Sequence, residues 1–199
     1  KRLTVFEQQG LVAELDFLFE CLSVGTSPYS SVCAWTGPLR APRDFTFGSC
    51  FVEVKSNRGS QSPVVKISSE FQLNCASDEK LFLHVVSLSE SPECKGMTLD
   101  EFVERVWQLL GNDYTGKEEF ERRLAAYGYC PLDEYGDRRW ETTGVASYEV
   151  VDGFPRILSS QLDAGVSCVQ YDLDLDRCAK FVVPSEAVYS VIELKKDGK

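Results

Sequence analysis

A stripe of leucines marks the start of the chain. The residues that recur at helical spacing, with no proline between them, are Leu11, Leu15, Leu18 and Leu22. This spacing predicts an amphipathic α-helix over residues 3–23. Glu14 lies three residues after Leu11 and four before Leu18, so it projects beside the buried stripe. A carboxylate there either reaches water at the edge of the stripe or faces a partner inside the protein.

The middle of the chain shows the patterns of strands and turns. Glycine and proline punctuate residues 24–43, which we predict to be loop with a short strand. Strands are predicted at 64–68 and 81–88, and the second is almost entirely apolar. His84 lies within that apolar run. A lone histidine in such a run is more often a hydrogen-bonded structural residue than a ligand, so we place it outside any site.

The second half begins with two helices. Thr98 followed by Glu101 is a capping-box signal, and an amphipathic helix should run from there to Gly111. A second helix is predicted over 117–127, ended by Gly128.

Strand-like patterns return after these helices, at 147–151, 166–175 and 188–194. In the 166–175 segment apolar residues alternate with polar and acidic ones, which is typical of a strand with one wet face. We interpret its acidic positions as a charged strand edge that discourages aggregation and not as a metal site.

The most informative local pattern is a hairpin around Gly48 and Ser49. A Gly-first pair suits a two-residue type II′ turn, and such a turn fixes the register of the two strands. Counting outward from it, Asp44 lies opposite Glu53, and Lys55 shares the face of Glu53. Two opposed carboxylates with Cβ atoms roughly 5 Å apart repel each other unless a cation lies between them.

A divalent metal ion would supply that cation. Mg²⁺ binds carboxylate oxygens and keeps several water ligands, so Asp44 and Glu53 could hold it, with Mn²⁺ as a substitute. The metal lowers the pKa of a bound water and polarises a phosphoryl oxygen, and the ammonium of Lys55 can orient the water or stabilise charge on phosphate. The hairpin therefore predicts metal-dependent phosphodiester chemistry.

Composition sets the broad class. The chain has 199 residues, of which 43% are hydrophobic and 12% aromatic, enough for a core in a globular α/β protein. Eight cysteines without a CxxC pair, and only one histidine, argue against zinc and favour free thiols in a reducing cytoplasm. We find no apolar run that could span a membrane and no signal peptide. The absence of an initiator Met suggests a fragment or a processed chain.

The net charge of −10 argues against strong unaided binding to nucleic acid, because phosphate contacts normally recruit Lys and Arg. Any basic footprint must be local. Arg40, Arg43 and Arg58 flank the hairpin, and we predict them, together with Arg156, as phosphate contacts. Surface salt bridges are the equally weighted alternative for these four residues.

Several segments of the chain together resemble a known family. They are GLVAEL at 10–15, WTGPL at 35–39, RDF at 43–45, EVK at 53–55, ISSEFQL at 67–73 and GFPRI at 153–157. Asp44 followed by Glu53-Val54-Lys55 is similar to the signature of the PD-(D/E)XK nuclease superfamily. The order of all six segments resembles the bacterial PD-(D/E)XK motif protein family, which is often encoded beside restriction or phage-defence genes.

The resemblance implies a restriction-endonuclease-like core, a mixed β-sheet flanked by helices, over residues 1–112. Residues 113–199 would form an α+β extension packed on that core as one domain. The resemblance also implies Asp44 and Glu53 as metal ligands, Lys55 as the catalytic lysine, Glu14 as a further acidic site residue and Gln72 as a supporting residue.

The function we expect is a Mg²⁺-dependent deoxyribonuclease, an endonuclease of a cytoplasmic restriction or phage-defence system. Its partners would be DNA, an ATPase or another defence subunit, and a second copy in a homodimer, with no membrane association. The alternative is a nuclease-fold subunit that no longer cuts and serves as a binding or assembly module, for which the acidic surface would suit a basic partner.

Overall fold

A mixed five-stranded β-sheet forms the centre of the protein. The structure is a computed structural model that describes residues 1–58, 63–90 and 95–194. The strands of the sheet, in spatial order, are β1 (Phe45–Phe47), β2 (Cys50–Asn57), β4 (Lys80–Glu90), β5 (Trp140–Glu149) and β7 (Val182–Val183). Only β2 and β4 are parallel to each other, and the other neighbours are antiparallel. The α/β class with a mixed sheet flanked by helices is thus as expected.

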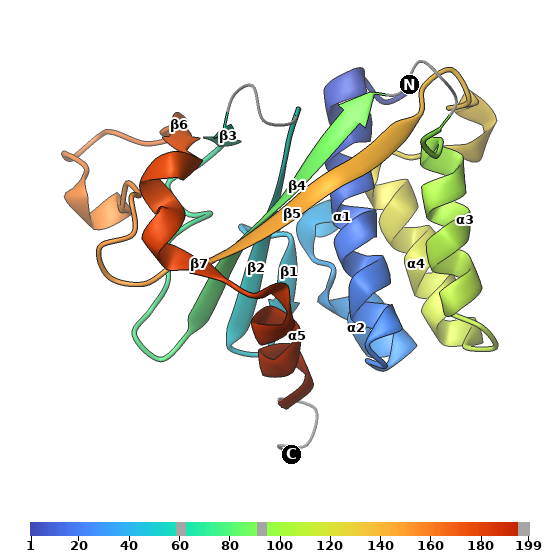
Figure 1. Ribbon diagram of the computed structural model, residues 1–199, viewed down its shortest axis with the longest axis horizontal. Helices are drawn as coiled ribbons and strands as arrows, with labels where there is room; N and C mark the ends of the chain where they lie inside the picture. The colour runs from blue at the N-terminus through green and yellow to red at the C-terminus, as the bar shows by residue number, and fades with distance from the viewer. Residues whose placement is uncertain (59–62, 91–94, 195–199) are drawn as a thin grey trace.

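Helices cover one face of this sheet (Figure 1). They are α1 (Val5–Ser23), α2 (Pro28–Ala34), α3 (Leu99–Leu109), α4 (Tyr114–Tyr127) and α5 (Ser185–Leu194). The predicted leucine stripe of α1 is buried in the larger core, between the sheet and α3. Capping boxes begin α1 at Thr4 and α3 at Thr98, and Gly128, with a φ of 104°, ends α4. The sequence signals at Thr98 and Gly128 are thereby confirmed.

A small second sheet covers the opposite face. It pairs β3 (Val64–Ile67) with β6 (Tyr171–Asp174) in antiparallel fashion, and the 3₁₀ segment η4 (Leu175–Phe181) follows β6 directly. Shorter 3₁₀ turns are η1 (Gly37–Leu39), η2 (Pro131–Asp133) and η3 (Ser159–Gln161). The apolar residues of this layer form a second core with β4 and β5. Strand β4 is consequently buried on both faces, which explains its nearly continuous apolar sequence.

The predicted hairpin is present with the predicted register. Phe47 pairs with Cys50 and Phe45 with Val52, and Gly48 has a φ of 62°, as the first position of a type II′ turn requires. The face that carries Phe45, Cys50 and Val52 lies in the larger core. The ladder ends at Phe45, so Asp44 lies just beyond it.

The structure corrects four predictions about secondary structure. The 24–43 segment contains the helix α2, with Pro28 at its first turn, where proline is tolerated. The 166–175 segment is a strand only from 171 to 174, and Cys168 adopts a left-handed φ of 59° that no regular strand accepts. The 188–194 segment is helical, because Val188 and Ile192, four residues apart, are both buried in the larger core. Strand β5 also begins at Trp140, seven residues before the predicted start at 147.

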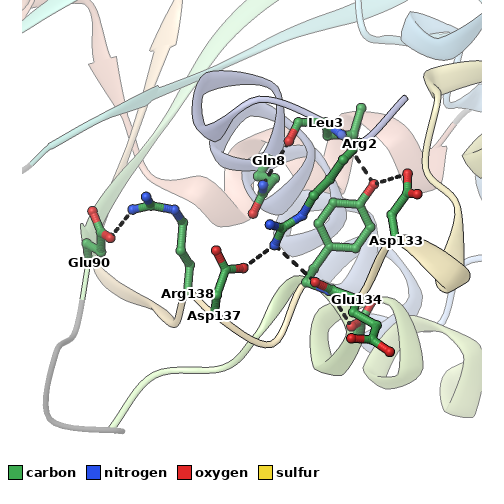
Figure 2. A network of polar contacts seen from close by, with 10 residues as sticks. Arg2, Leu3, Gln8, Glu90, Asp133, Glu134, Asp137 and Arg138 are labelled. Carbon is green, nitrogen blue, oxygen red and sulfur yellow. Dashed lines mark hydrogen bonds and ion pairs between the residues drawn. The ribbon is translucent and has the colours of Figure 1, made fainter.

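A polar network ties the start of the chain to the loop that follows α4 (Figure 2). Arg2 donates to the carbonyl of Glu134 at 3.0 Å and forms an ion pair with Asp137. The Nε2 of Gln8 donates to the carbonyl of Leu3 at 2.9 Å. This network stabilises the first turn of α1, the helix that carries Glu14.

The described cysteines, all but Cys94, are free thiols. In the described part of the chain, no helix is long and apolar enough to cross a membrane.

Candidate active site

Asp44 is positioned by the end of the hairpin ladder. Because β1 ends at Phe45, the edge of β2 beyond Val52 has no backbone partner from β1. The Oδ2 of Asp44 takes that place and accepts a hydrogen bond from the backbone N–H of Val54 at 2.8 Å. The carboxylate is therefore fixed against β2, next to Glu53 and Lys55.

Glu53 and Lys55 form an ion pair on one face of β2. The Nζ of Lys55 lies 2.6 Å from the Oε1 of Glu53, whose side chain is 0% exposed. The Oε2 of Glu53 is also buried, and among the described residues it has no hydrogen-bond partner. A buried carboxylate oxygen without a partner is costly to fold, so its presence suggests a role other than stability.

Glu14 reaches the same place from α1. Its Oε2 accepts a hydrogen bond from the indole Nε1 of Trp35 at 2.6 Å. A Cβ added to Gly37 would lie 3.0 Å from the Oε2 of Glu14 and 3.0 Å from the Oδ1 of Asp44, so the two oxygens are no more than twice that distance apart. A side chain at position 37 would therefore press on both carboxylates. The carboxylate predicted to lie beside the leucine stripe is therefore inside the protein and has a partner.

Gln72 binds Lys55 from a turn and not from a helix. Its Oε1 accepts hydrogen bonds from the Nζ of Lys55 at 3.2 Å and from the backbone N–H of Ser68 at 2.7 Å. The turn is clamped by two of the predicted DNA-binding arginines. Arg43 donates to the carbonyl of Asn74, and Arg156 donates to the carbonyl of Leu73 at 2.8 Å.

Arg40 and Arg58 are more exposed than these two arginines. Arg40 ends η1 in the left-handed conformation, with a φ of 62°. Arg58 follows β2, donates to the Oε1 of Gln9 at 3.4 Å and lies 6.0 Å from the ring of Phe6. Both side chains are exposed, whereas Arg43 and Arg156 are occupied in the turn beside Gln72.

Sequence reasoning missed Trp35 and Tyr127 as site residues. Trp35 follows α2, and its carbonyl accepts a hydrogen bond from the buried Arg123 of α4, which fixes the indole against Glu14. Tyr127 ends α4, and its hydroxyl donates to the carbonyl of Glu7 at 3.2 Å. Burial and the nearby carboxylates of Glu14 and Asp44 raise the pKa of Tyr127. The WTGPL segment was the only signal for Trp35, and no local pattern pointed to Tyr127.

The electrostatics of the cluster favour a bound cation. Burial, and then the neighbouring Asp44, raise the pKa of Glu53 to about 8. Burial also raises the pKa of Asp44 and, with the charge of Asp44 added, raises the pKa of Glu14 well above its ordinary value. Burial alone would lower the pKa of Lys55, but attraction to Glu53 and Asp44 outweighs it, so that the pKa is raised and the side chain stays an ammonium.

The residues present fit a divalent metal ion. The described residues hold no group of three His, Cys, Asp or Glu side chains arranged to bind a metal ion. Mg²⁺, however, needs only one or two carboxylates because it keeps several waters. Asp44 and Glu53 supply two, and the unpartnered Oε2 of Glu53 is a free donor atom in this buried setting. A cation there would also offset the repulsion from Asp44, which adds to burial in raising the pKa of Glu53.

His84 lies outside this cluster, as expected. It lies on β4, is 1% exposed and shares a hydrogen bond of 2.9 Å between its Nδ1 and the hydroxyl of Ser147. Burial lowers its pKa to about 4, so it is neutral at physiological pH.

Comparison with known protein families places the chain in a family. A family model described as "Putative PD-(D/E)XK family member, (DUF4420)" matches residues 1–176. No curated protein and no solved structure matches the chain. The matched range includes the whole cluster around Lys55, and the mixed sheet flanked by helices agrees with a restriction-endonuclease-like fold. Since the match covers most of the sequence and the acidic residue and acid-x-Lys signature meet in space, the chain belongs to this PD-(D/E)XK family, DUF4420.

Proposed function

We propose that this protein is a metal-dependent nuclease that hydrolyses phosphodiester bonds of DNA. The observation that carries the proposal is the convergence of Asp44, Glu53 and Lys55, with one buried oxygen of Glu53 left without a partner. A purely structural site would gain from replacing such a group with an apolar one. Membership of a nuclease-like family supports the same conclusion.

The metal ion we propose is Mg²⁺, or Mn²⁺ in its place, held by Asp44 and Glu53. When bound, it would polarise a phosphoryl oxygen and lower the pKa of a coordinated water. Asp44 is pre-positioned for this by its bond to the amide of Val54, so that its second oxygen remains available. Both carboxylates must be ionised to bind a metal, and their raised pKa values therefore make binding stronger as pH rises.

Lys55 would act as a cation and not as a general base. Its raised pKa keeps it protonated, so it can donate hydrogen bonds to the charge that develops on the phosphate and can orient the attacking water. The Oε1 of Gln72 holds the ammonium in place at 3.2 Å. Glu14, whose pKa is raised by burial and then by Asp44, accepts a hydrogen bond from the indole of Trp35, which orients it.

Arg40 and Arg58 are proposed as phosphate contacts that position the strand. Arg43 and Arg156 would contribute less directly, by holding the turn that carries Gln72. The net charge of −10 makes unaided DNA binding weak, which supports a partner with a basic surface, such as an ATPase or another subunit of a restriction or phage-defence system in the cytoplasm, or a second copy of the chain.

Nicking of a closed circular plasmid tests the proposal, because a substrate without ends reports only endonuclease activity. We expect cleavage with Mg²⁺ or Mn²⁺ and none with EDTA. Lys55→Ala should abolish cleavage, whereas Lys66→Ala, which removes an exposed lysine on β3, should leave it unchanged. Cleavage that survives Lys55→Ala would overturn the assignment of the site.

The acidic residues need their own control. Glu53→Gln should abolish both cleavage and the heat of Mg²⁺ binding in calorimetry. Asp16→Asn alters another buried carboxylate, one paired with Arg105 at 3.3 Å and away from the cluster, and should alter neither. A wild type that binds metal but cuts no DNA would favour the assembly module over the nuclease.

A further inference from the structure

The face of β2 that carries Glu53 and Lys55 continues to Asn57. Side chains two apart on a strand share a face, so these three residues point to the side of the sheet that β3 and β6 cover. Lys55 is in register with Val85 of β4, and Asn57 with Ser87. Asn57 and Ser87 are therefore the next pair along the two strands after Lys55 and Val85.

A cavity of about 510 Å³ opens at this position. Its floor is the sheet, with Asn57, Val85, Ser87 and Gly144, and its far wall is η4, with Leu175 and Ala179. Its volume is typical of sites that bind small ligands. Because Val85 both lines the cavity and is the register partner of Lys55, the cavity adjoins the candidate active site.

The lining of the cavity favours an uncharged, flat group with hydrogen-bonding edges. Val85 and Leu175 are apolar, and Tyr148 adds an aromatic ring. Asn57 contributes a buried Oδ1 that has no hydrogen-bond partner among the described residues. The only charged residue among the described lining is Asp176, which would repel a phosphate. Apolar and aromatic walls with a few polar groups are how proteins hold a nucleobase that has left the stack.

We propose that this cavity binds an unpaired nucleobase of the DNA strand whose phosphate lies at Lys55. The inference rests on the proposed nuclease function and extends it, since it assigns a substrate class: DNA with an unpaired or extruded nucleotide at the site of cleavage. Lys55 and Asn57 are two positions apart on the strand, roughly 7 Å, a distance that the sugar of one nucleotide can span. The phosphate would meet the ammonium of Lys55, and the base would donate a hydrogen bond to the Oδ1 of Asn57.

Gly144→Leu would fill the cavity without straining the backbone. A Cβ at Gly144 has its nearest neighbour, the Cβ of Ser87, at 4.0 Å, and the residue has no left-handed φ. Gly136→Leu is the matched control, because a Cβ there meets nothing within 4 Å and the residue lies in the turn before β5, away from the cavity. Ala179→Leu fills the cavity from its exposed wall and serves as a second variant if Gly144→Leu does not fold.

The assay measures affinity by fluorescence anisotropy in EDTA at low ionic strength. A fully paired duplex is compared with the same duplex carrying one bulged nucleotide. Extruding a paired base costs a few kcal/mol, and a bulged nucleotide avoids this cost because it is already unpaired. The wild type should therefore bind the bulged duplex about tenfold more tightly or better. Gly144→Leu should lose this preference, Gly136→Leu should keep it, and Asn57→Leu should weaken it.

Equal affinity of the wild type for the two duplexes would overturn the inference, and so would a preference that Gly144→Leu retains. Failure to bind either duplex counts against it as well. Cleavage is scored separately with Mg²⁺ and plasmid. A wild type that cuts DNA without preferring the bulge leaves the nuclease proposal standing and removes the base-binding cavity. A wild type that prefers the bulge through this cavity but does not cut keeps the cavity and overturns the nuclease.

Discussion

Replacing Glu53 with glutamine should stabilise the metal-free protein, and the gain should grow as pH rises. Glu53 is fully buried, and its Oε2 lacks a hydrogen-bond partner among the described residues. Its pKa is raised from 4.5 to about 8, chiefly by burial and then by Asp44. Between these two pH values the folded state holds a proton that the unfolded state has lost. Stability therefore falls as pH rises through this window.

The size of the effect follows from the same shift. At about 1.4 kcal/mol per pKa unit, the rise from 4.5 to about 8 corresponds to about 5 kcal/mol in total. About 3 kcal/mol of this should be lost between pH 5 and pH 8. Glutamine has nearly the same shape but does not ionise, so the variant should lack this part of the pH dependence.

Urea unfolding in EDTA at several pH values measures the difference between wild type and Glu53→Gln. Subtracting the two curves cancels the groups that do not interact with Glu53, such as His84. A difference that does not grow between pH 5 and pH 8 would refute the reasoning, because Glu53 would then ionise as easily folded as unfolded. Mg²⁺ at 100 times its dissociation constant should restore about 2.7 kcal/mol to the wild type and leave Glu53→Gln unchanged.

Further predictions concern the groups around this carboxylate. Trp35→Phe removes the indole donor to Glu14 and should cost about 1 kcal/mol of stability, measured by urea unfolding, and slow DNA cleavage without changing Mg²⁺ affinity. Asp44→Asn can still accept from the amide of Val54, so thermal unfolding monitored by circular dichroism should change little while calorimetry shows weaker Mg²⁺ binding. His84→Gln should protect against acid: the pKa of His84 is lowered from 6.5 to about 4, so the wild type loses about 2 kcal/mol between pH 7.5 and pH 5 that the variant keeps. Identical acid unfolding of the two proteins would contradict this.

The candidate site combines residues of two kinds. The hairpin brings Glu53 and Lys55 onto one face and carries Asp44 to the end of its ladder, and all three follow from a turn and a two-residue period that the sequence displays. Such local rules work because side-chain direction alternates strictly along a strand. Glu14 and Gln72 were expected only from the resemblance, since nothing local indicates that a helix and a distant turn meet at the same strand.

Two of the wrong predictions have a common physical cause. Residues 188–194 and 166–170 contain strand-forming side chains, but short apolar runs do not distinguish a helix from a strand. Residues 188–194 form a helix because Val188 and Ile192, at helical spacing, are both buried in the larger core. Residues 166–170 are not a strand, because Cys168 adopts a left-handed backbone conformation.

By itself, the sequence determined the long helices, the caps at Thr98 and Gly128, the hairpin register and the acid-x-Lys strand, because each depends on neighbours within a few residues. Only the tertiary structure decided that Trp35 orients Glu14, that Tyr127 lies near the carboxylates and that a cavity adjoins Lys55. These contacts join residues separated by tens of positions. They depend on which surfaces pack together to exclude water, and no local pattern encodes that choice.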